Sequence, residues 1–245
     1  MNKSRAIRSS CLIYLLLVIT GVTNAQVKTS ELLISFQPTA NGKSLVLKDS
    51  SYINYFNENY TITRLKYYIS NIHFDGQING TLNQNIFLMD AAEENRVRLN
   101  VPAGTYSQLY FTIGVDSILN CSGAQEGALD PLNGMFWTWN SGYIFFKLEG
   151  FSSSSPADLN RMEHHIGGYR GPNKAGRTIK LQLEKPLVVK ENDKHQVNLQ
   201  LNLDHYWASE NEIKIKDNPV VMVPGELAKR SADNFKDMFS ILSVQ

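Results

Sequence analysis

Hydrophobic residues alternate with polar residues in six short segments of the chain, and a period of two is typical of β-strands with one buried face. The alternating apolar positions are Leu32, Ile34 and Phe36; Leu65, Tyr67 and Ile69; Leu109, Phe111 and Ile113; Ile144, Phe146 and Leu148; Ile179, Leu181 and Leu183; and Val197, Leu199, Leu201 and Leu203. Turn signals such as Asp75-Gly76 lie between these segments. The pattern predicts an all-β domain, an antiparallel β-sandwich or barrel-like fold.

The C-terminal part of the chain has a helical period instead. Pro224-Gly225 precedes apolar or small residues spaced three and four apart, which are Leu227, Ala228, Ser231, Ala232, Phe235, Met238 and Phe239. We therefore predict a C-terminal helix that covers one opening of the β structure. The four serines at 152–155 are too few to separate domains and are predicted to form a mobile loop. A single domain over residues 26–245 follows.

Residues 1–25 have the layout of a secretory signal peptide. A basic start is followed by an apolar run at residues 12–19 and a small-residue end at residues 23–25. The apolar run is too short to span a membrane. Cys11 precedes that run, which argues against a lipoprotein anchor at this cysteine. We therefore expect cleavage after residue 25 and an exported protein, either periplasmic or extracellular.

Charge and cysteine content exclude several classes of protein. Removal of the three basic residues of the signal peptide changes the formal net charge from +1 to −2, and no basic cluster remains to suggest nucleic-acid binding. The mature chain keeps one cysteine, Cys121, so it forms no intramolecular disulfide. A lone thiol is either buried and inert or a metal ligand. Because no second ligand lies close to Cys121 in sequence, we predict a buried thiol.

The most aromatic segment spans residues 134–150. Trp137 and Trp139 lie one residue apart, so an extended backbone places both indoles on the same face. The alternation continues through residues 144–149, and we predict one aromatic-rich strand. Aromatic side chains at this density usually fill a core. The alternative is an oxidisable, electron-rich site.

The adjacent histidines His164 and His165 are the first candidates for metal ligands. In an extended strand they point to opposite faces, so one ion cannot take both without a bulge. Imidazole is the commonest metal ligand in proteins, and an exported copper site favours it. However, the chain has no H-x-H, H-x-x-x-H or paired cysteines. Spacing alone therefore favours histidines that are satisfied in the core or at the surface.

Other candidate chemistry has weaker support. The turn at residues 130–134 offers oxygen ligands for calcium, but Asp-Pro and Asn-Gly are ordinary turn sequences. The chain has no Gly-x-Ser-x-Gly, no His-Glu-x-x-His and no phosphate-binding glycine loop. Some carboxylates could pair as acid and base, as in almost any β protein; they are Asp116, Asp130, Glu149 and Glu163.

Several motifs together resemble the MbnP-like copper-binding proteins, which are exported β-proteins, some of them encoded beside methanobactin genes. The similar segments are Tyr67–Ile72, Phe111–Asp116, Gly127–Pro131, Gly134–Gly150, His165–Gly168, Pro224–Ala228 and Ala232–Phe235. They follow one another in order over essentially the whole mature chain. The Trp-Thr-Trp sequence at residues 137–139 is the most specific of them.

The resemblance implies a copper site made of histidine imidazoles and a kynurenine, which forms when a partner diheme cytochrome of the peroxidase type oxidises a tryptophan. On this basis Trp137 or Trp139 is the oxidised residue. His165 aligns with the family's histidine motif, and His164 is an additional neighbour. The second histidine has no clear counterpart, and His205 is a candidate by position alone. The chain would then be the substrate of an oxidising enzyme and not an enzyme itself.

Two other hypotheses compete with copper binding. The first is a structural or ligand-recognition β-sandwich that has lost the metal, with Tyr206 and Trp207 as a platform for carbohydrate. The missing second histidine motivates this hypothesis, and exposed aromatic rings would be needed for it. The second is an enzyme in its own right, for which the sequence offers no recognisable catalytic motif.

Overall fold

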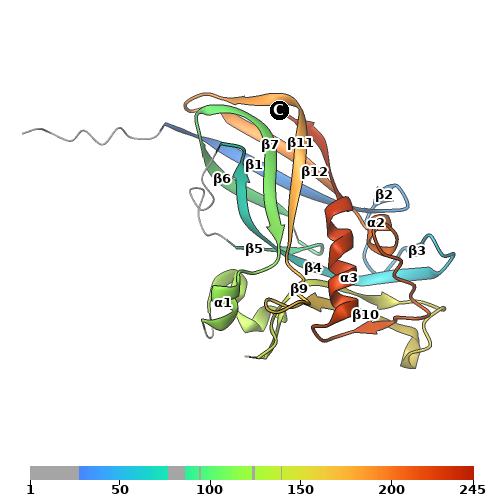
Figure 1. The fold of residues 1–245 in the computed structure, drawn as a ribbon. Coiled ribbons are helices and arrows are strands. Elements are labelled where there is room, and N and C mark those ends of the chain that lie inside the picture. The colour runs from blue at the N-terminus through green and yellow to red at the C-terminus, as the bar shows by residue number, and fades with distance from the viewer. Residues whose placement is uncertain (1–27, 77–85, 94, 123–124, 139) are drawn as a thin grey trace, which may run out of the picture.

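The computed structural model describes residues 28–76, 86–93, 95–122, 125–138 and 140–245 (Figure 1). The predicted signal peptide lies outside these residues. Among the residues described, no helix combines the length and the apolar character that a membrane crossing requires.

The described residues form two β-sheets. The five-stranded sheet contains β14 (Phe239–Val244), β12 (Lys194–Asn202), β1 (Thr29–Ala40), β2 (Lys43–Ser44) and β6 (Arg96–Pro102). The nine-stranded sheet has the path β11 (Arg177–Val189), β7 (Gly104–Ile113), β4 (Asn59–Phe74), β9 (Gly142–Phe151), β10 (Arg161–Gly167) and β13 (Val220–Val221). Three short strands extend it: β3 (Ser51–Ile53) and β5 (Phe87–Asp90) pair with β4, and β8 (Phe136–Thr138) pairs with β9.

The sandwich-like, mostly β fold is confirmed, but its sheets are mixed instead of purely antiparallel. Strand β1 runs parallel to β12, and β10 runs parallel to β13. The other strand pairs of the described chain are antiparallel. Parallel partners need a long connection, and nearly the whole nine-stranded sheet separates β1 from β12 along the chain. Pairing between such distant segments is not visible in local sequence patterns.

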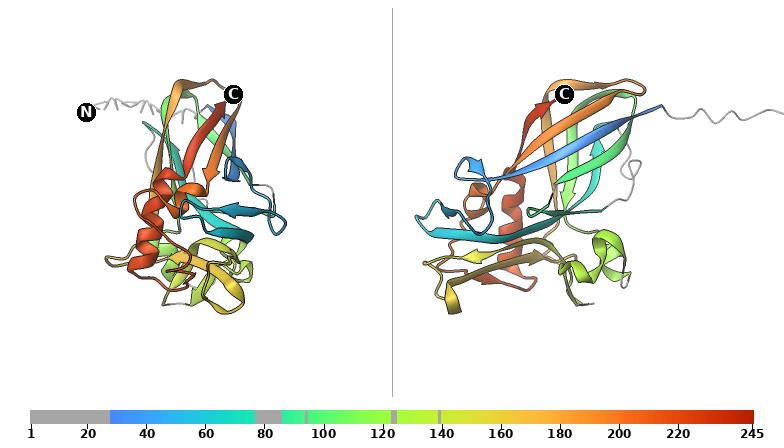
Figure 2. Two further views of the ribbon diagram at one scale, coloured as in Figure 1. Left: turned by 90° about the vertical axis from the view of Figure 1, so that its right-hand side faces the viewer. Right: turned by 180° about the vertical axis from the view of Figure 1, so that it is seen from behind.

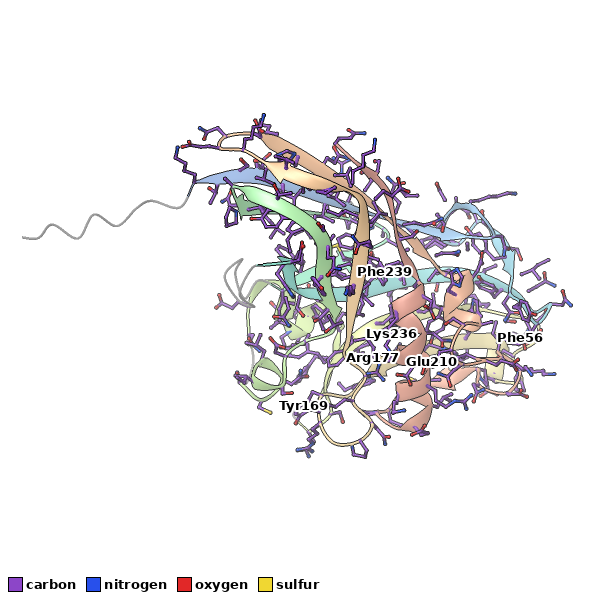
Figure 3. The ribbon with its side chains drawn as sticks, turned by 45° about the horizontal axis from the view of Figure 1, so that its top comes forward. Phe56, Tyr169, Arg177, Glu210, Lys236 and Phe239 are labelled. Carbon is purple, nitrogen blue, oxygen red and sulfur yellow. The ribbon has the colours of Figure 1, made fainter. Side chains whose placement is uncertain are left out.

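Aromatic side chains fill the space between the two sheets. Phe36 of β1 meets Phe111 of β7 edge to face, with ring centroids 5.7 Å apart, and Phe111 meets Phe239 of β14 at 5.1 Å. Figure 3 shows Phe239 at the beginning of β14. All the alternating apolar positions predicted from the sequence are buried. In β1, β7, β11 and β12 the period of two therefore identified the more buried face, whereas in β9 and the middle of β4 residues of both faces are buried.

The C-terminal segment covers the face of β9 and β10 that points into the molecule. Helix α3 (Glu226–Asp233) is followed by the 3-10 turn η4 (Asn234–Asp237), and the chain then enters β14 (Figures 1 and 2). The predicted helix is therefore too long, because Phe239 begins a strand that pairs with β12. Phe235 of η4 packs against Phe146 of β9 with ring centroids 5.0 Å apart. Two residues before Phe235, Asp233 ends α3 and accepts two hydrogen bonds from Arg177 of β11, at 2.6 and 2.8 Å. Arg177 is labelled in Figure 3.

The short helices lie in connecting segments. They are α1 (Ser117–Cys121), η1 (Gly127–Leu129), η2 (Pro131–Asn133), η3 (Asp158–Asn160) and α2 (Asp204–Trp207). The serine loop is not mobile as predicted, because two of its side chains are buried and bonded. Ser152 Oγ donates to the carbonyl of Asn59, and Ser155 Oγ donates to that of Arg161, each at 2.6 Å.

Candidate functional site

The aromatic segment that the sequence predicts as one strand is a β-hairpin. Strand β8 carries Trp137, the chain turns, and β9 begins at Gly142 with a φ of 74°, which favours glycine. Phe136 pairs with Tyr143 across the hairpin. Trp139 lies outside the described residues, so the predicted common face of the two indoles stays a prediction. In β9 every residue from 142 to 148 is buried, so both faces of this strand are covered, and the pairing with β10 is irregular between Ile144 and Phe146.

Strand β9 is hydrogen-bonded to β4 on one side and to β10 on the other, and it has two different faces. Its inner face packs Phe146 against α2 and η4. Its outer face carries Lys147 and Glu149. The Lys147 ammonium is almost buried and donates to the carbonyl of Gly134, just before β8. Burial lowers the pKa of Lys147, against the opposing effect of the nearby Glu149 carboxylate.

His165 lies on this outer face, directly across from Lys147 in the β9–β10 pair. Its side chain is only 8% exposed, and its Nε2 is 2.7 Å from Oε1 of Glu149. Arg64 of β4 donates to the other oxygen of Glu149 at 2.6 Å. The hydrogen bond from His165, together with the charges of Arg64 and Lys147, outweighs burial and lowers the pKa of Glu149. The carboxylate is therefore ionised at neutral pH.

The indole of Trp137 lies over the backbone of Gly167. A Cβ atom on Gly167 would be 2.8 Å from the indole ring, so this position has room for glycine alone. Gly167 is two residues beyond His165 in β10, which is roughly 7 Å along an extended strand. The indole and the imidazole are therefore neighbours along β10. The Nε1 of Trp137 is buried and has no hydrogen-bond partner within the described part of the chain.

His164 occupies the inner face, as the strand geometry predicts, and the structure does not bring it to His165. One of its ring nitrogens, Nε2, is 2.8 Å from the carbonyl of Asn218, so that nitrogen donates. The other, Nδ1, then accepts from the hydroxyl of Tyr206 at 2.7 Å. Burial lowers the pKa of His164 to about 4, so the ring is neutral at pH 7. Both nitrogens are used, and neither is left for a metal.

The remaining histidines do not complete a metal site. His205 is exposed on α2, whose neighbouring residues Tyr206 and Trp207 fill the inner core. His73 stacks on Tyr110 with ring centroids 4.9 Å apart. Within the described ranges, no three His, Cys, Asp or Glu side chains are grouped so that they could hold a metal ion. Of the predicted site residues, His165 lies on β10 two residues before Gly167, the glycine that the Trp137 indole approaches.

Three further expectations can be compared with the structure. The Asp130 carboxylate accepts from the backbone N–H of Leu132 at 2.8 Å, which is the ordinary turn chemistry and gives calcium no support. Cys121 is exposed, so the prediction of a buried thiol is wrong. The carbohydrate platform is also wrong, because Tyr206 and Trp207 are completely buried. Their rings pack against each other and against Tyr60 and Phe146, so neither of these two rings offers an exposed surface.

Comparison with known proteins identifies the family. A model of the MbnP family matches residues 29–223, which is most of the chain. The chain belongs to the MbnP family. The fold is similar to that of MbnP from Methylosinus trichosporium, with a TM-score of 0.54 and 17% sequence identity over 76% of this chain and 80% of that one. At this identity the likeness concerns the fold alone. No curated protein matches the chain.

Family membership confirms the resemblance drawn from the sequence motifs, but the sequence did not reveal how the site is held together. The sequence analysis named Glu149 as one of four carboxylates without separating it from the other three. Its bond to His165 depends on the register between β9 and β10. The alternation in β9 already placed Lys147 and Glu149 opposite the core face, which is the signal that could have selected them. The glycine after His165-Ile166 could likewise have indicated a bulky neighbour.

The buried neutral ring of His164 predicts a pH-dependent stability. Its native pKa of about 4 lies below the unfolded value of about 6.5, so the unfolded chain binds the proton more tightly. The neutral ring makes its full contribution to the free energy of unfolding above pH 6.5. That contribution, about 3 kcal/mol in total, is lost as the pH falls toward 4. Urea unfolding of the wild type and of His164→Gln at pH 7 and pH 4.5 measures it. We expect a smaller loss in the variant, and an equal loss in both proteins would contradict the assignment.

The contact between Trp137 and Gly167 predicts that Gly167→Ala is destabilising. The added methyl group would lie 2.5 Å from the Tyr143 carbonyl and 2.8 Å from the indole. Overpacking of this kind costs about 1–3 kcal/mol. We expect that loss in urea unfolding, together with a shifted tryptophan emission. The matched control is Gly176→Ala, whose Cβ would meet nothing closer than 3.8 Å. Equal stability of the two variants would show that the indole does not occupy this position.

Proposed function

We propose that this MbnP-family protein binds copper on the outer face of β9 and β10, with His165 and an oxidised Trp137 as protein ligands. The observation that carries the proposal is the nearly buried His165 imidazole, which lies two residues along β10 from Gly167. The Trp137 indole approaches that glycine, and its buried Nε1 has no partner among the described residues. The family implies copper, and imidazole is a suitable donor for an exported copper site.

The chemistry of the two residues fits such a centre once the tryptophan is modified. An indole offers no good ligand atom, whereas kynurenine supplies an amine and a carbonyl oxygen. Oxidation therefore converts a packing residue into a coordinating one close to Gly167, two residues along β10 from His165. Trp139 stays an alternative site of oxidation, since it lies outside the described residues.

The proposed centre contains one protein imidazole instead of the two that the family resemblance implied. His164 is excluded because both its nitrogens are engaged on the inner face. We leave out His205 because it is exposed on α2 and no contact joins it to the site residues within the described chain. A centre with few protein ligands keeps positions open for an exogenous donor. That property suits a protein that acquires or hands over copper.

We further propose that the chain is exported and acts as the substrate of a diheme peroxidase-like partner, and that it is not a catalyst. The signal-peptide layout of residues 1–25 supports export, to a periplasm or to the cell exterior. A one-electron oxidant can draw electrons from a tryptophan through the protein. The oxidant therefore needs to dock on the surface and does not need access to the indole.

Copper binding to natively expressed protein tests the proposal. Equilibrium dialysis with Cu(I) and with Cu(II) should give one copper per chain, and peptide mass spectrometry should find kynurenine at residue 137 or 139. Loss of a residue that only hydrogen-bonds to a metal ligand typically lowers metal affinity 10–100-fold. Because His165 is proposed as a ligand itself, we expect His165→Ala to lower copper affinity by about 100-fold or more. The matched control, His205→Ala, should retain the wild-type affinity.

The competing hypothesis is a β-sandwich that has lost its metal, and the same experiment separates the two. It predicts that neither the wild type nor the variants bind copper above the background of a β protein without the site. Wild-type stoichiometry and affinity in His165→Ala would reject our ligand assignment.

A further inference from the structure

A cavity in the edge of strand β4, which we call the notch, points to a second ligand. It is lined by three basic side chains, one carboxylate and the side chains of two leucines, together with a threonine and two alanines. We infer that the notch binds a small organic acid, whose carboxylate is held by Lys48 and Arg64 and whose apolar part lies against Leu45 and Leu47. Binding of this acid is independent of copper, because none of these four residues is a proposed metal ligand.

The notch is a gap in strand pairing. The short strands β3 and β5 both pair with β4, on the edge away from β9, but they leave the middle of that edge uncovered (Figure 1). There the N–H of Lys48 donates to the carbonyl of Ile62 at 2.7 Å, and the N–H of Ala91 donates to that of Leu65 at 2.9 Å. The cavity between these two connections has a volume of about 540 Å³. This volume is typical of sites for small molecules.

The lining of the notch has an excess of positive charge. Lys48, Arg64 and Lys66 line it together with one carboxylate, that of Asp90. Lys66 pairs with Asp90 at 2.8 Å, and Arg64 donates through Nη1 to Glu149 at 2.6 Å. Lys48 is exposed and forms no ion pair with any described residue. One positive charge therefore remains even when Glu149 is counted, and a cleft with an excess of one charge concentrates ligands of the opposite sign.

Arg64 keeps donors for a ligand after its bond to Glu149. Its side chain is 52% exposed, and neither Nε nor Nη2 has a partner in the described part of the chain. A guanidinium presents its N–H groups as a planar fork that matches a carboxylate. Leu45 and Leu47 are only partly buried against the core, so they add apolar surface to the same cavity. A carboxylate joined to a short hydrocarbon chain uses both parts of the lining, whereas an inorganic anion uses only the charged part.

Lys48 occupies a backbone conformation that favours glycine. Its φ is 71°, in the left-handed region, which is unfavourable for a residue with a Cβ atom. The hydrogen bond from its N–H to Ile62 holds it in this conformation. Strained residues of this kind concentrate at sites that bind ligands. Because the residue is both exposed and part of the lining, the strained turn places its charge at the rim of the notch.

Titration of the ¹⁵N-labelled, metal-free protein with sodium hexanoate tests the inference, with nuclear magnetic resonance as the readout. At pH 7 and constant ionic strength, the backbone amides of Lys48, Arg64 and Ala92 should shift and reach saturation in the millimolar range. Acetate lacks the hydrocarbon chain and hexan-1-ol lacks the charge, so each should bind at least about tenfold more weakly. Shifts that do not saturate, or that saturate at amides outside the notch, would overturn the inference. Equal affinity for inorganic phosphate would show a general anion site and would overturn the assignment of an organic acid.

Variants of Lys48 connect binding to the charge at the rim. Lys48→Met keeps the length of the side chain and removes its charge, so we expect hexanoate affinity to fall about tenfold. Lys48→Arg should restore most of that affinity. The matched control is Lys180→Met, which removes an exposed lysine from β11, outside the lining, and should bind hexanoate as the wild type does. Unchanged affinity in Lys48→Met, with a spectrum that shows the variant to be folded, would refute the role of this lysine.

Discussion

The structure depends on strand β9 being hydrogen-bonded on both edges and covered on both faces. Its inner face packs Phe146 into the core, and its outer face presents Lys147 and Glu149. A slip of one residue would move these charges into the core and the aromatic rings out of it, so the register is strongly specified. Because β10 pairs with β9, this same register decides which of its two histidines reaches the outer face.

Two neighbouring histidines consequently have different surroundings. His164 lies in the core, where Tyr206 and Asn218 satisfy both of its ring nitrogens and where burial keeps it neutral. His165 lies on the opposite face, where Glu149 engages one nitrogen and no described residue engages the other. Adjacency in sequence gives no common site in a strand, since consecutive side chains point to opposite faces. Both ring nitrogens of the first histidine are therefore engaged in the core, whereas the second has only its bond to Glu149 among the described residues.

Local patterns in the sequence were sufficient for the strands and their inward positions, but not for contacts between distant segments. The alternation of apolar residues gave the core face of β1, β7, β11 and β12 because burial on one side imposes a period of two. The bond between Glu149 and His165 depends on strand pairing, which composition and spacing do not encode. The same reason explains the error over Tyr206 and Trp207, whose burial depends on β9, β10 and α2 packing together. The hairpin at Gly142 was missed because its aromatic residues continue on both sides of the turn.

The most direct test of the account is the position of copper in a crystal of the natively expressed protein grown with one equivalent of Cu(I). Anomalous diffraction at the copper absorption edge locates the ion independently of any assumption about its ligands. The account predicts a single peak at bonding distance from the imidazole of His165, on the outer face of β9 and β10. A peak next to His164 or His205, or no ordered copper in the crystal, would contradict it.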